Sequence, residues 1–194
     1  MPSDSNDPLL ALRSATREHH DRVDRLMDLQ RLQDPVHYAR VLQVLAAFLA
    51  GWEPAIASAL PARWQHWLHS RSRRGFLQQD LQVLRIAGPA PARIAAPATH
   101  AAAWGSIYVM EGSALGGQFI ARALARSGRD AQRGAAYFHG WGDATGSMWR
   151  EVRALLATEL ATPAAIAQAC EAARQTFDTL AHMLETIHER TAAA

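Results

Sequence analysis

The spacing of hydrophobic residues predicts helices along most of the chain. After Asp7-Pro8, and again after Asp34-Pro35, apolar side chains recur at intervals of three and four, which is the spacing of one helix face. An aspartate or threonine before proline often starts a helix, because its side chain caps the first turn and proline fits the first helical position. Thr162-Pro163 repeats this signal. Further helical stretches follow at about 63–70, 75–86, 97–127, 147–160 and 163–191.

No stretch alternates apolar and polar residues between hairpin turns, as a half-buried strand would. The glycine- and proline-rich breaks at 88–91 and 134–146 are too short to separate two domains. We therefore expect an all-α fold, with a single domain over residues 1–194 and a flexible N-terminus over residues 1–7.

Composition narrows the possible functions. Twenty Lys and Arg residues against 18 Asp and Glu residues leave a formal charge of only +2, so we expect no nucleic-acid partner. The single cysteine, Cys170, excludes an internal disulfide and a multi-cysteine metal site. The first residues show no basic region followed by an apolar run, and the longest apolar stretch, 41–60, contains Glu53 and Pro54. We expect a cytoplasmic protein without a membrane partner.

His20 and Asp24 lie four residues apart, and therefore on one face of the first predicted helix. A histidine that binds a metal commonly donates its second ring N–H to an acceptor such as a carboxylate, which fixes the tautomer. Arg13, seven residues earlier on the same face, could reach an anion beside whatever His20 binds. On spacing alone this is weak evidence, because a helical histidine is more often a surface or packing residue. His19 is the immediate rival, but it points about 100° away.

Three glycines, Gly112, Gly116 and Gly117, interrupt the predicted helix at 97–127. Each costs roughly 1 kcal/mol relative to alanine in a helix interior, so the set costs about 3 kcal/mol and needs a cause. One cause is close packing against another helix, which the spacing alone favours. The other is a flat ligand that lies against the bare backbone, with the glycines also allowing a kink.

A second glycine-rich segment, Phe138 to Arg150, contains several aromatic residues. It is not a dinucleotide-binding loop, because the spacing differs and no strand precedes it. Arg150 could meet a carboxylate, although a solvated arginine is the commoner outcome. The carboxylates elsewhere are too dispersed for a di-iron centre, which needs Glu-x-x-His repeats on facing helices.

Taken together and in order, these segments resemble the haem oxygenase family. Leu12-Arg13-Ser14-Ala15-Thr16, with His20 four residues after the threonine, is similar to the family's N-terminal motif. Tyr108 to Gln118 is similar to the distal-helix motif of the bacterial branch, and Phe138 to Trp149 to a later segment of that branch. The likeness covers about residues 9–184. It points to the biliverdin-producing enzymes that are found with bacteriophytochromes.

The resemblance implies roles on the proximal side of haem and around its edge. His20 corresponds to the iron ligand, and Asp24 to the acidic partner of that histidine. Arg13 and Arg150 correspond to basic residues that meet the haem propionates. Phe177 corresponds to an aromatic residue that walls the pocket.

On the distal side, Gly112, Gly116 and Gly117 correspond to the glycines against which haem lies, and Gly112, Ser113 and Gly116 are the expected catalytic positions. Ser113 departs from the mammalian relatives, which carry an aspartate that anchors distal water. Serine is common in the bacterial branch. The resemblance therefore leaves open how this chain organises its distal water.

The implied fold is a haem oxygenase-like helical bundle with a kinked distal helix. The implied reaction is oxidative cleavage of haem to biliverdin, carbon monoxide and ferrous iron, with haem as both cofactor and substrate. It requires dioxygen and an external electron donor such as a ferredoxin, a flavodoxin or a reductase, because nothing in the chain binds a flavin or nicotinamide. A bacteriophytochrome that receives biliverdin is a further expected partner by analogy.

Two alternatives stay open at this stage. The first is a non-enzymatic haem carrier or sensor on the same fold, which would also need His20. The second is a helical relative of the thiaminase or di-iron type, which would bind no haem.

Overall fold

The computed structural model describes residues 7–192, with side chains described as far as residue 186. Its α-helices are α1 (Pro8–Met27), α2 (Pro35–Ala59), α3 (Gln65–Ser70), α4 (Arg74–Val83), α5 (His100–Ala125), α6 (Ala136–His139), α7 (Thr145–Glu159) and α8 (Pro163–Ala192). Short 3-10 helices lie at Arg31–Gln33, Ala62–Trp64 and Gly142–Ala144. The described residues contain no strand, and the predicted all-α fold is confirmed.

The long helices begin at the predicted caps. The Asp7 carboxylate accepts hydrogen bonds from the backbone N–H groups of Leu9 and Leu10, and proline follows at the first helical position. Asp34 caps α2 in the same way, and the hydroxyl of Thr162 accepts from the N–H of Ala165 in α8. The expected flexible segment at residues 1–7 lies outside the described residues, except for Asp7.

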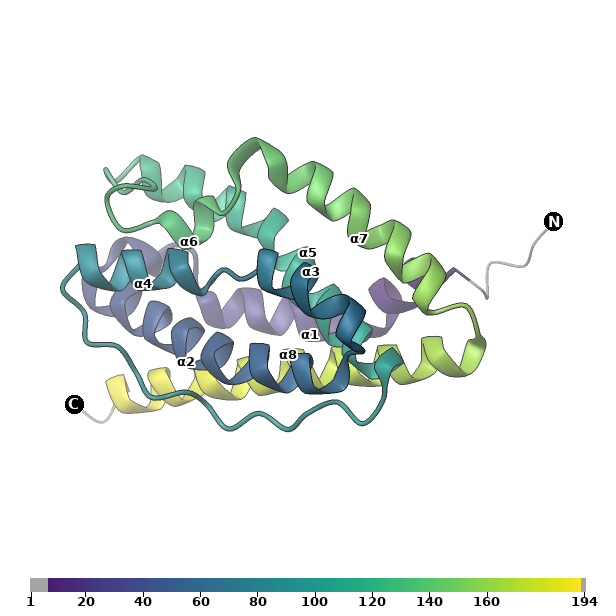
Figure 1. Ribbon diagram of the computed structural model, residues 1–194. Helices are drawn as coiled ribbons and strands as arrows, with labels where there is room; N and C mark the ends of the chain where they lie inside the picture. The colour runs from purple at the N-terminus through teal and green to yellow at the C-terminus, as the bar shows by residue number, and fades with distance from the viewer. Residues whose placement is uncertain (1–6, 193–194) are drawn as a thin grey trace.

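Helix α8 packs against both α1 and α5, while α7 crosses above α5 at the top of the view (Figure 1). Helix α2 packs against α4 and α8 on the side facing the viewer. The distal helix α5 is kinked part-way along, as the sequence predicts. Because α8 contacts both α1 and α5, it determines how these two helices are placed relative to one another.

Gly105 brings the backbones of α5 and α8 into direct contact. A Cβ atom at this position would lie 1.9 Å from the carbonyl oxygen of Ala169, so no side chain fits there. Gly105 and Ala169 are both buried. A larger residue at position 105 would force the two helices apart.

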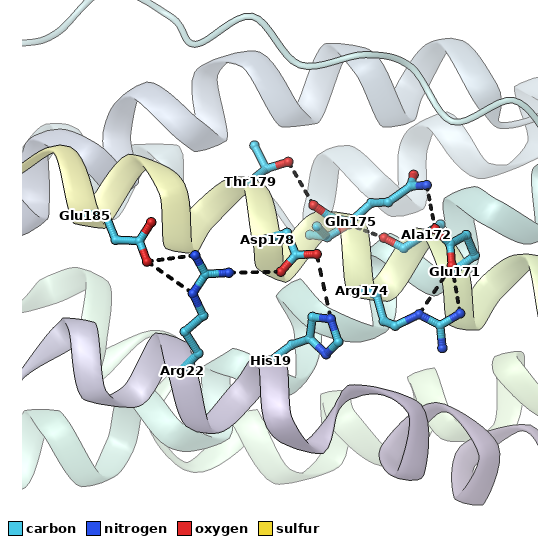
Figure 2. Close-up of polar contacts among 10 residues, drawn as sticks. His19, Arg22, Glu171, Ala172, Arg174, Gln175, Asp178, Thr179 and Glu185 are labelled. Carbon is cyan, nitrogen blue, oxygen red and sulfur yellow. Dashed lines mark hydrogen bonds and ion pairs between the residues drawn. The ribbon is translucent and has the colours of Figure 1, made fainter.

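Charged residues also line the contact between α1 and α8 (Figure 2). Arg22 of α1 contacts Glu185 at 2.7 Å and Asp178 at 3.4 Å, both on α8. His19 lies 3.7 Å from the same Asp178. These groups are partly exposed, so each pair is expected to contribute at most about 1 kcal/mol. Their positions nevertheless show which face of α1 is turned toward α8.

Helix α2 is, among the described helices, the one long and apolar enough to cross a membrane by length and composition. This is weak evidence, because a core helix of a soluble protein meets the same criterion. Its inward side chains, among them Tyr38, Leu42 and Phe48, belong to the hydrophobic core.

The segment 134–146, expected to be a loop, contains the short helix α6 and the start of α7. Asp80 of α4 explains this difference. Its buried carboxylate accepts hydrogen bonds from the N–H groups of Ala136 at 2.7 Å and Tyr137 at 2.9 Å, and so takes the place of a local cap. Burial raises the pKa of Asp80 to about 6, although the two N–H groups oppose the rise. The capping residue lies far away in sequence, so no local pattern predicts α6.

We expect Asp80→Ala to lower the free energy of unfolding by roughly 2–4 kcal/mol, because two buried N–H groups lose their acceptor. A carboxyl whose pKa is raised in the folded state binds a proton more readily there than in the unfolded chain, so its contribution to stability grows as pH falls from above 6 toward 4. Denaturant unfolding of both proteins should therefore give a larger stability difference at pH 5 than at pH 7. A difference that is constant or smaller at pH 5 would contradict the buried-cap account.

Candidate active site

His20 projects from α1 with one of its two ring nitrogens in contact with a carboxylate. Its Nδ1 lies 3.2 Å from a carboxylate oxygen of Asp24, one turn later on the same helix. The side chain is 57% exposed, which leaves the ring accessible to a ligand. The hydrogen bond to Asp24 is the main reason that the pKa of His20 lies above its usual value, while burial acts in the opposite direction. This arrangement presents Nε2 as the nitrogen that can bind a metal.

Phe177 of α8 stands beside His20. The two rings meet edge to face with centroids 5.7 Å apart, and Phe177 is buried. The structure therefore brings together two predicted site residues that are far apart in sequence. His19, the rival ligand, contacts Asp178 on α8 instead.

Helices α1 and α5 approach one another one turn before His20. Burial raises the pKa of Tyr108 in α5, and a hydrogen bond with Thr16 and the charge of Arg13, both in α1, act against the rise. Thr16 lies four residues before His20, and Tyr108 lies four residues before Gly112. His20 on α1 and Gly112 on α5 therefore each lie one turn beyond the point where the two helices meet.

The distal glycines differ in what surrounds them. A Cβ atom at Gly116 would meet nothing within 4 Å, so this position is open. At Gly112 it would lie 3.6 Å from the ring of Trp149 in α7, which is ordinary contact. At Gly117 it would lie 3.1 Å from the carbonyl oxygen of Phe138, so this glycine allows α6 to pack closely against α5. Gly117 is turned away from the open position, and its contact with haem stays a prediction.

Arg13 and Arg150 are both exposed. Arg150 lines a cavity of about 360 Å³ beside the first turn of α1, together with Arg153, Asp7 and Leu9. Leu9 lies one turn before Arg13, so both predicted arginines are close to the same part of α1. Arg153 was not predicted from the sequence.

These residues fit haem, a flat dianion with a central metal. His20 has one ring nitrogen, Nε2, that Asp24 does not hold, Gly116 leaves a stretch of helix unobstructed, and the two arginines carry positive charge. Within the described residues, no three His, Cys, Asp or Glu side chains group as a set of metal ligands. A metal held mainly by a macrocycle needs no such set.

Comparison with protein families shows which family the chain belongs to. The model of the haem oxygenase family, described as "Heme oxygenase", matches residues 7–186. The chain belongs to the haem oxygenase family. A haem oxygenase of Xanthomonas campestris pv. campestris (strain 8004) is 36% identical over 145 residues, which cover 72% of this chain and 84% of the relative.

The fold agrees with a solved haem oxygenase. The NO- and CO-bound haem oxygenase of Neisseria meningitidis superposes with a TM-score of 0.76, covering 90% of this chain and 88% of the other, at 24% identity. The predictions of the family, of the helical fold and of an enzyme rather than a carrier are therefore confirmed. The individual roles of the site residues of this haem oxygenase remain predictions.

Sequence reasoning missed two residues that shape the distal helix. Trp149 was seen only as part of an aromatic segment, yet it covers Gly112. No motif in its immediate sequence distinguishes Arg73 from the other arginines, yet its buried guanidinium donates a hydrogen bond to Ser113 at 2.8 Å. A cluster of three arginines at 71, 73 and 74, beside few other charges, was the only sequence signal that could have pointed to it.

We expect Asp24→Asn to lower the pKa of His20 toward its usual value near 6.5, because Asp24 provides the largest contribution that raises it. The matched control is Asp21→Asn, which removes a nearby carboxylate that raises this pKa least. Histidine proton signals followed by NMR against pH in the haem-free protein measure both changes. An equal shift in the two variants would show that net charge, rather than the Asp24 hydrogen bond, sets this pKa.

Proposed function

We propose that this haem oxygenase binds haem between α1 and α5, with Nε2 of His20 as the axial ligand of the iron. The observation that supports this most strongly is the geometry of His20: one nitrogen is held by Asp24, the ring lies against Phe177, and the side chain is more than half exposed. A histidine packed in the core would have little exposed surface, whereas His20 combines an exposed ring with a carboxylate on one nitrogen and an aromatic side chain from α8 beside it.

Each surrounding residue then has a physical role toward haem. Asp24 holds the proton on Nδ1, which keeps Nε2 deprotonated for the metal and makes the imidazole more basic. Phe177 restricts rotation of the imidazole ring through its edge-to-face contact. Arg13 and Arg150 pair with the two propionates, since an arginine fork matches a carboxylate.

On the distal side, Gly116 lets the backbone of α5 lie against the porphyrin, because no side chain intervenes. Gly112 and Ser113 precede it by about one turn and border this surface, Gly112 beside the ring of Trp149 and Ser113 with its side chain exposed. Bound haem supplies the iron at which dioxygen is activated and is also the molecule that is opened, giving biliverdin, carbon monoxide and ferrous iron. The protein supplies an axial base below and a polar but sterically small surface above.

The proposal includes partners. The oxidation consumes electrons, so an external donor such as a ferredoxin, a flavodoxin or a reductase delivers them. A bacteriophytochrome is proposed as a recipient of biliverdin. We further propose that the chain acts as a single domain, since its buried side chains form one hydrophobic cluster. We also propose that it works in the cytoplasm.

We expect His20→Ala to abolish the histidine-ligated haem spectrum while the helix content stays unchanged, because the side chain is largely exposed and little packing is lost. The control is His19→Gln, at the neighbouring position that faces Asp178. Absorption spectra of the haem-loaded proteins and circular dichroism of the haem-free proteins measure the two effects. A parent-like spectrum in His20→Ala, or its loss only in His19→Gln, would move the ligand elsewhere.

We expect Gly116→Leu to weaken haem binding at least tenfold, because the new side chain occupies the space where the porphyrin lies; a loss of about 1.4 kcal/mol suffices for this factor. Gly75→Leu is the matched control, since Gly75 is another helical glycine at which an added Cβ atom would meet nothing within 4 Å. Haem titration followed by absorbance gives both dissociation constants. Equal affinity of Gly116→Leu and the parent would refute the contact.

A further inference from the structure

Two buried arginines of the short connection between α3 and α4, residues 71–73, contact the distal helix α5. Arg71 is 7% exposed and Arg73 is 5% exposed. Buried guanidinium groups are rare unless their charge is paired or all their N–H groups find acceptors. What each arginine contacts therefore indicates what it does.

Arg71 is paired with carboxylates. Its Nη1 donates to Glu111 at 2.8 Å, and its Nη2 contacts Glu151 at 2.5 Å. Arg71 thus joins α5 to α7 through an ion-pair network, and its charge is compensated by direct contact. This is the usual role of a buried arginine.

Arg73 has different partners. Its Nη2 donates to the carbonyl oxygen of Met110 at 2.6 Å and to the hydroxyl oxygen of Ser113 at 2.8 Å, both in α5. Its guanidinium also lies 4.9 Å from the centre of the Tyr137 ring. These groups are uncharged, so Arg73 has no carboxylate in contact with it, and Glu111 and Glu53 interact with its charge only from a greater distance.

The charge of Arg73 acts on the nearby carboxylate of Glu111. Burial raises the pKa of Glu111, and the charge of Arg71 followed by that of Arg73 opposes the rise. A fixed positive charge therefore lies next to Ser113, which is exposed and sits three residues before the open position at Gly116.

The hydrogen bonds of Ser113 are almost fully determined. Its hydroxyl donates to the carbonyl oxygen of Met110 at 2.8 Å and accepts from Arg73. A hydroxyl has one proton and two lone pairs, so one lone pair remains. Ser113 can therefore only accept a further hydrogen bond, and a water molecule beside it must donate one.

Met110 is affected as well. Its carbonyl receives N–H from Arg73 and O–H from Ser113, and both compete with the helix's own N–H for this oxygen. Side chains that insert into the helix hydrogen-bond ladder are a known cause of kinks. Met110 lies two residues before Gly112, where the glycine-rich stretch of α5 begins.

We propose that Arg73 is a positioning residue for the distal side of haem: it fixes the Ser113 hydroxyl as a hydrogen-bond acceptor for water and places a positive charge beside that water. This inference rests on the proposed function, because it requires haem to lie against α5. Arg73 acts through Ser113 and does not itself touch haem. The residue that organises the distal side thus comes from the α3–α4 connection rather than from α5 itself.

The test compares Arg73→Met with the parent protein, using carbon monoxide bound to the ferrous haem-loaded protein as the probe. A nearby positive charge lowers the C–O stretching frequency, so we expect Arg73→Met to shift it upward. Arg73→Lys keeps the charge but lacks the fork that reaches two oxygens, and should give an intermediate value. Arg74→Met is the control, because Arg74 is partly exposed and lies 3.9 Å from Glu53; its stretch should equal that of the parent.

An unchanged stretching frequency in Arg73→Met would overturn the proposal, as would an equal shift in Arg74→Met. If Arg73→Met does not fold, as judged by circular dichroism, Ser113→Ala decides. This variant removes the exposed hydroxyl through which Arg73 acts, so we expect a shift in the same direction, and a parent-like frequency would overturn the proposal. Failure of the parent protein to bind haem through His20 would instead contradict the proposed function, so the two failures can be told apart.

Discussion

The separation between α1 and α5 is the constraint on which the site depends, and α8 sets it. On one side, Gly105 lets the backbone of α5 touch the carbonyl of Ala169, so the distal helix is held at a fixed distance from α8. On the other side, α1 packs along α8, and the pairs of Arg22 with Asp178 and Glu185 show which face of α1 is turned toward α8 (Figure 2). His20 and Gly116 are therefore placed by a third helix that contacts both of theirs.

The charged side chains on the two sides of the site have opposite signs. His20, the proposed iron ligand, is held by the carboxylate of Asp24, which favours positive charge on the imidazole. The guanidinium groups of Arg71 and Arg73 lie against α5, and of the two Arg71 is ion-paired with carboxylates, whereas Arg73 contacts uncharged oxygens. With haem bound as proposed, the carboxylate-held histidine would face one side of the ring and the positive charge of Arg73 would lie behind the helix on the other side, an arrangement suited to an iron that activates dioxygen. The open backbone at Gly116 provides the space between them.

Local sequence patterns predicted those features that depend only on residues close together in the chain. The caps at Asp7, Asp34 and Thr162 and the three-to-four spacing predicted the long helices, and the His20–Asp24 spacing predicted their contact. Helix α6 was missed because its cap, Asp80, comes from α4. The packing of Gly117 against Phe138 and the contact of Arg73 with Ser113 were missed for the same reason, since both depend on how distant elements meet.

The central claim is that haem lies between His20 and the glycine stretch of α5, and a crystal structure of the haem-loaded protein tests it most directly. We expect iron bonded to Nε2 of His20, Nδ1 still in contact with Asp24, and the porphyrin lying against Gly116. Iron bonded to a different side chain, or a porphyrin bound away from Gly116, would contradict it.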